Sequence, residues 1–242
     1  MSDDTQSPTT PPELPHSEKQ VLKQEPMPGE IRLPTTIDAL LKQPGQIFYE
    51  LSQDNERKIS MHLLAVFATS FLVFGFVLGL FSGGTQLWAA PLKVLLGAFV
   101  SALITFPSLY VFSCLSGIDI SFKKAAGALG IGLCLSGLVL LGLCPVGWIF
   151  SQSTESVSCM AFFALLFWGV GIAFGCSLIN RAIESESSRG KGYFVFWTGI
   201  FVVVTLQMST SLRPIVGPAE DTFLQHEKKF FLTHWMETLD AD

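Results

Sequence analysis

Five long apolar stretches occupy the middle of the chain, and each is almost free of charged residues. Short polar connections separate them, and they cover residues 61–82, 90–115, 125–150, 157–180 and 193–212. A helix needs about 20 apolar residues to cross a hydrocarbon core of roughly 30 Å. Connections this short make neighbouring helices antiparallel. The pattern predicts an all-α fold, a polytopic membrane bundle with five transmembrane helices over residues 61–217.

The composition agrees with a membrane protein. Only 14% of the residues are charged, against about 25% in an average soluble domain, and the mean hydropathy is +0.47. A charge at the centre of a membrane helix costs about 2.5–3.5 kcal/mol even on an insertion scale, which explains the depletion. The net charge of −5 gives no reason to expect a nucleic-acid partner.

The segments before the first span differ from each other. Residues 1–35 are rich in Pro, Ser, Thr and acidic residues and carry too little apolar surface to offset the entropy of ordering, which predicts a disordered cytoplasmic arm. Residues 36–60 have apolar positions at helical spacing, interrupted by Pro44. We expect two short amphipathic juxtamembrane helices there, with Thr36 or Asp38 capping the first.

The chain ends in a polar segment with regularly spaced aromatic residues, among them Phe223, Phe230 and Trp235. Their spacing predicts that residues 218–242 form an amphipathic C-terminal helix. Such a helix would lie in the membrane interface, with binding of a protein partner as the alternative.

Basic residues mark alternate ends of the predicted spans. They are Arg57, Lys58, Lys123, Lys124, Arg181, Arg189 and Lys191. Because cytoplasmic connections carry the excess of Lys and Arg, this alternation predicts a cytoplasmic N-terminus and a C-terminus outside. Trp88 and Trp148 would then lie at the outer interface, and Tyr193 and Trp197 at the inner one.

Small residues recur four positions apart in several spans. Gly75 and Gly79, Gly171 and Gly175, and the series Ala128, Gly132 and Ser136 follow this spacing. Small residues let helix backbones approach closely in a membrane. The interpretation we favour is packing inside the bundle, and a face for a homo-oligomer is the alternative.

Polar residues inside the spans form the candidate functional cluster. Thr105 and Ser108 lie near Pro107, and their hydroxyls could bond a carbonyl that the proline leaves without its amide partner, or could line a polar groove. At the end of the fifth span come Gln207, Ser209 and Thr210, followed by Arg213. Arg213 would reach the outer headgroups, bind a lipid phosphate or pair with Glu155.

Signatures of catalysis and of cofactor binding are missing from the sequence. The chain has no zinc-protease, hydrolase-elbow or phosphate-loop motif, and His226 and His234 lack the spacing of a zinc pair. The five cysteines lie in or beside apolar stretches and contain no Cys-x-x-Cys pair. We therefore expect no enzyme activity, no cofactor and no metal.

The layout resembles the bacterial form of the Yip family, the Ypt-interacting proteins. A polar N-terminal segment, a short Leu-Leu…Pro…Phe…Leu stretch over residues 40–51 and five apolar helices carry the resemblance, which covers residues 37–215. It implies a non-enzymatic multi-pass protein of the bacterial inner membrane that organises partners or lipids.

Two functions compete. The first is a membrane scaffold or interaction protein, embedded in the lipid bilayer, with a membrane or cytoplasmic protein partner bound through residues 1–60. The second is a channel or small-solute permease that uses Thr105, Ser108 and Gln207. An enzyme acting on lipid at the outer interface, through Arg213 and the C-terminal helix, is a more distant third.

Overall fold

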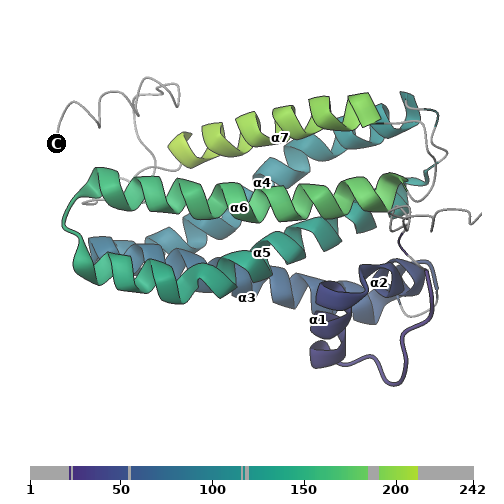
Figure 1. Ribbon diagram of the computed structural model, residues 1–242, viewed down its shortest axis with the longest axis horizontal. Coiled ribbons are helices and arrows are strands. Elements are labelled where there is room, and N and C mark those ends of the chain that lie inside the picture. The colour runs from purple at the N-terminus through teal and green to yellow at the C-terminus, as the bar shows by residue number, and fades with distance from the viewer. Residues whose placement is uncertain are drawn as a thin grey trace, which may run out of the picture.

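The computed structural model describes residues 22, 24–53, 56–115, 117, 120–184 and 191–211, and these residues form helices and no strands. Two of these helices are short and five are long, and Figure 1 labels each of them. They are α1 (Leu33–Lys42), α2 (Pro44–Leu51), α3 (Glu56–Ser82), α4 (Gln86–Leu115), α5 (Phe122–Ser153), α6 (Val157–Glu184) and α7 (Lys191–Ser211).

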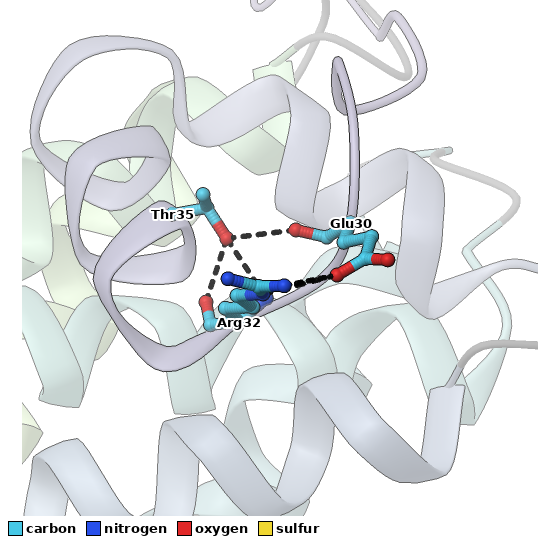
Figure 2. Close-up of polar contacts among 3 residues, drawn as sticks. All are labelled: Glu30, Arg32 and Thr35. Atoms are coloured by element: carbon cyan, nitrogen blue, oxygen red, sulfur yellow. Dashed lines mark hydrogen bonds and ion pairs between the residues drawn. The ribbon is translucent and has the colours of Figure 1, made fainter.

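Proline separates the two short helices, as expected. Pro44 is the first residue of α2, a position that a proline occupies without losing a helical hydrogen bond. Helix α1 begins at Leu33, before the predicted caps. Figure 2 shows that Thr35 closes its first turn, where the Thr35 hydroxyl accepts from the Arg32 amide at 2.9 Å and lies 2.7 Å from the Arg32 carbonyl oxygen. The Arg32 guanidinium in turn bonds the Glu30 carboxylate at 2.6 Å.

The predicted disordered arm, residues 1–35, includes residues 24–35, which the structure describes. In residues 24–35, Met27 and Ile31 pack against the apolar core, and the Met27 amide donates to Glu50 Oε1 at 3.2 Å. Glu50 is a buried residue of α2. Apolar contacts and this charge-assisted hydrogen bond hold a proline-rich segment that composition alone would leave unstructured. Residues 1–21 and 23 lie outside the described residues, as does the predicted C-terminal helix.

Four of the long helices, α3 to α6, are long and apolar enough to cross a membrane. The fifth predicted span corresponds to α7, whose described apolar part is shorter and covers Tyr193–Ser209. The structure therefore supports an integral membrane bundle with several crossing helices. Each long helix begins and ends within about five residues of its predicted boundary.

The long helices surround a common centre. Helix α5 packs most extensively against α6 and α3, α3 also packs against α4, and α4 packs against α7, whereas α6 and α7 make little contact. A tight turn joins α3 to α4, with Gly83 and Gly84 at φ +65° and +54°. Helices α1 and α2 lie together at one end of the bundle (Figure 1), which we call the α1–α2 end.

Small residues pack inside the bundle, as we favoured. A Cβ added to Gly75 would lie 2.5 Å from Pro91 Cα, and one on Gly79 would lie 2.7 Å from the Gln86 carbonyl oxygen, so both glycines bring α3 against α4. On α6, a Cβ on Gly175 would lie 2.0 Å from Ser136 Oγ of α5. Only glycine permits backbones to approach this closely.

Candidate functional site

Thr105 and Ser108 use their hydroxyls within α4. Thr105 is 1% exposed, and its Oγ1 donates to the Ser101 carbonyl oxygen at 2.8 Å. Ser108 Oγ donates to the Thr105 carbonyl oxygen at 2.7 Å. Hydroxyls that bond the preceding turn of their own helix are common next to a helix proline, and Pro107 lies inside α4. These two hydroxyls therefore hydrogen-bond the backbone of α4 itself.

Trp197 completes this site, and its position corrects a sequence prediction. It was expected in an aromatic belt at the inner interface, but its side chain is 0% exposed. Its indole Nε1 donates to the Thr105 carbonyl oxygen at 3.1 Å, and its ring stacks on Phe201 with centroids 5.4 Å apart. A carbonyl near a helix proline is a good acceptor for a buried indole, which needs a partner. No pattern in the sequence indicated that Trp197 and Thr105 would pair.

The polar end of α7 lies apart from this site. Gln207 and Ser209 are partly buried, and Ser209 Oγ donates to the Leu206 carbonyl oxygen at 2.7 Å. Gln207 follows Trp197 by ten residues, roughly 15 Å along a helix axis. The predicted cluster is thus two separate groups, one around Thr105 and one at the end of α7. Thr210 belongs to α7, and Arg213 lies outside the described residues.

A small cavity lies at the centre of the bundle. Every long helix contributes to its lining, and examples are Phe71, Ala98, Ser136, Ile172 and Thr205. Its volume is about 20 Å³, which is room for roughly one water molecule. Most of the lining is apolar, and the Thr205 hydroxyl is buried with no hydrogen-bond partner in the described part of the chain. The cavity at the centre of the described bundle is therefore small.

The remaining chemistry-bearing groups are scattered. Within the described ranges, no three His, Cys, Asp or Glu side chains come together in a group that could hold a metal. The Cys134 thiol is buried and lies 3.1 Å from the Leu63 carbonyl oxygen, where it joins α5 to α3. Comparison with known proteins finds no matching family model, no similar curated protein and no similar solved structure.

Proposed function

We propose that this chain is a non-enzymatic integral membrane protein that crosses the bilayer five times and organises partners or lipids there. Helix α7 is the fifth span. Its apolar part, Tyr193–Ser209, would extend roughly 25 Å, which suits a span at the short end of the usual range. This arrangement agrees with the layout that resembles the Yip family.

The orientation follows from charges at the ends of the helices. Arg57 and Lys58 begin α3, Lys123 and Lys124 begin α5, and Arg181 lies in the last turn of α6. All five therefore belong to the α1–α2 end, and the excess of basic residues on the cytoplasmic side assigns this end to the cytoplasm. Five spans then carry the C-terminus to the outside.

The packed bundle centre is the observation that carries the proposal. A permease needs a path or an alternating cavity lined by groups that replace the hydration of its solute. Here the central cavity holds about 20 Å³, and the hydroxyls of Thr105, Ser108 and Ser209 bond backbone carbonyls of their own helices. These features favour a structural or interaction role over transport.

Helix α1 offers the surface for a partner. Its inner face buries Thr36, Ala39 and Leu40, whereas Leu33 and Leu41 are 41% and 58% exposed. These two leucines are eight positions apart, so they lie on one side of the helix. An exposed apolar pair on a short amphipathic helix is typical of a contact with a protein or with the membrane surface.

Affinity capture from native membranes in mild detergent tests the role. Leu41→Glu should remove specific partners that the wild type retains, while Gln43→Glu, the same charge at an exposed polar position, should keep them. Identical capture by all three chains would contradict a partner site on α1.

Flux into proteoliposomes addresses the alternative. The scaffold proposal expects potassium, proton and glycerol fluxes equal to those of empty vesicles. A flux above that level that Thr105→Val or Gln207→Leu abolishes would instead establish a channel or permease.

A further inference from the structure

A wide space lies between α3 and α5, beside the central cavity, with which it shares Leu133 as a lining residue. It has a volume of about 310 Å³ and runs from Glu56 and Lys123 at the α1–α2 end to Phe67 and Cys134. Leucine and phenylalanine side chains of α3 form one wall. Gly127 and Gly130 of α5 form part of its floor, and a Cβ on Gly130 would meet no atom within 4 Å. The space is an open, mostly apolar groove.

The length of the groove matches one leaflet of a bilayer. On α3 it extends from Glu56 to Phe67, and on α5 from Lys123 to Cys134, which is eleven residues on each helix. At 1.5 Å per residue this is roughly 16 Å, close to half of a hydrocarbon core of about 30 Å. An extended acyl chain therefore fits along it from the interface to the middle of the membrane.

The mouth of the groove is polar and carries net positive charge. A second space of about 240 Å³ adjoins it and shares Leu51, Lys123 and Gly127, and Ser52 and Lys124 also line it. Lys123 forms an ion pair with Glu56. The described charged residues that line the mouth are two lysines and one carboxylate, a formal charge of +1, and lysines at a membrane surface attract anionic lipid headgroups.

We propose that this groove is a binding site for an anionic glycerophospholipid of the leaflet at the α1–α2 end. The Lys123 and Lys124 ammonium groups bind the headgroup phosphate, and one acyl chain lies in the groove over Gly127 and Gly130. The missing side chain of Gly130 leaves the room, whereas Leu51 of α2 lies over Gly127 at the entrance, 3.1 Å from a Cβ placed there. The site adds a lipid ligand to the proposed function. It rests on that function only for the placement of the chain in a membrane.

Native mass spectrometry of the full chain in detergent, titrated with phosphatidylglycerol or phosphatidylcholine, tests the site. Gly130→Leu should weaken phosphatidylglycerol binding about tenfold or more, because its side chain displaces buried methylenes of the lipid. Gly142→Leu is the matched control on the same helix, since a Cβ there also meets nothing within 4 Å, and it should bind as the wild type does. Equal binding by the two variants would overturn the proposal.

The charge at the mouth is tested separately. Lys123→Gln with Lys124→Gln changes the formal charge of the mouth from +1 to −1 and should reduce the preference for phosphatidylglycerol over phosphatidylcholine about thirtyfold, as expected for the loss of two cations near the membrane. Lys42→Gln removes a lysine from α1, outside the groove, and should leave the preference unchanged. A preference unaltered by the double substitution would contradict the headgroup assignment.

Photocrosslinking identifies the occupant without any substitution. Phosphatidylglycerol with a diazirine near the end of one acyl chain should label peptides that contain Leu63–Phe67 or Gly130–Cys134. Labelling elsewhere, a mass shift of a second copy of the chain instead of a lipid, or occupation by residues 1–21 would each overturn the proposal. Partner capture through Leu41 has an independent readout, so the lipid site and the proposed function can fail separately.

Discussion

Trp197 of α7 donates its indole hydrogen to the carbonyl oxygen of Thr105 of α4 across 3.1 Å, although the two residues are 92 positions apart in the chain. Both are almost fully buried. The bond ties the last described helix to the middle of α4, next to Pro107. Since α6 and α7 make little contact, the pairing of α7 with α4 is what holds α7 in the bundle.

Trp197→Phe should therefore destabilise the protein by about 0.5–1.5 kcal/mol, since it removes the indole donor but keeps the ring stacked on Phe201. Trp197→Ala should cost about 3–5 kcal/mol, because it also leaves a cavity. Reversible unfolding in mixed detergent micelles measures both. Phe196→Ala, which truncates an exposed aromatic residue one position away, is the control and should have a much smaller effect.

The α5–α6 contact gives a prediction with a control on the same helix. Gly175→Ala places a methyl group 2.0 Å from Ser136 Oγ and 2.6 Å from the Gly132 carbonyl oxygen, so the helices must separate at a cost of about 1–3 kcal/mol. At Gly169 a Cβ meets nothing within 4 Å. Gly169→Ala should leave stability unchanged or raise it by up to about 1 kcal/mol, because alanine favours a helix more than glycine does.

Thermal unfolding in detergent distinguishes the two alanine variants. If Gly169→Ala and Gly175→Ala lowered the melting temperature equally, close backbone approach would not be what joins α5 to α6.

Thr105→Val tests how the polar residues of α4 are used. Its hydroxyl bonds carbonyl oxygens of its own helix, and valine has nearly the same shape. We expect a loss of stability below about 1 kcal/mol, since a backbone acceptor that keeps its helical partner tolerates losing a second donor. A loss several times larger would mean that the hydroxyl has a role between helices.

The helices and their close contacts could be predicted from the sequence, for physical reasons. A bilayer imposes length and apolarity on each span, so the boundaries of α3 to α6 could be read from residue types alone. Glycines four residues apart signalled close approach because few other reasons favour them in a helix. Pro44 similarly fixed the boundary between α1 and α2.

Relations between distant residues could not be predicted. Trp197 appeared to be an interfacial aromatic because it lies one turn from Tyr193, and nothing local revealed that Thr105 would supply its acceptor. The distance between Gln207 and Thr105 depends on the axial position of α7 relative to α4. The lengths of the connections between helices do not determine that position. The same holds for the α3–α5 groove, since its lining comes from four helices.

The N-terminal segment offers a fourth stability test. Glu50→Met removes the acceptor of the Met27 amide at similar volume, and it should release residues 24–32 from α2, because the bond to a buried carboxylate stabilises by about 1.5–3 kcal/mol. Amide exchange at Met27 should accelerate at least tenfold, whereas exchange in α5 should not change. Glu50→Gln keeps an acceptor oxygen and should show an intermediate rate. Unchanged exchange in Glu50→Met would mean that apolar packing of Met27 and Ile31 holds the segment alone.

Cysteine labelling in intact cells tests the orientation. In a variant without native cysteines, single cysteines at Thr85 and Thr154 lie in the turns opposite the α1–α2 end, and those at Ser52 and Ser121 lie at that end. Basic residues are retained on the cytoplasmic side, so a membrane-impermeant maleimide should label the first pair from outside and the second pair only after the membrane is opened. The reverse pattern would move the α1–α2 end, and with it the lipid groove, to the outer leaflet. Equal labelling of both pairs from outside would contradict any single orientation. If only Thr85 and Thr154 are labelled from outside, a cysteine at Asp242 decides whether α7 crosses, because external labelling of that cysteine then requires the fifth span.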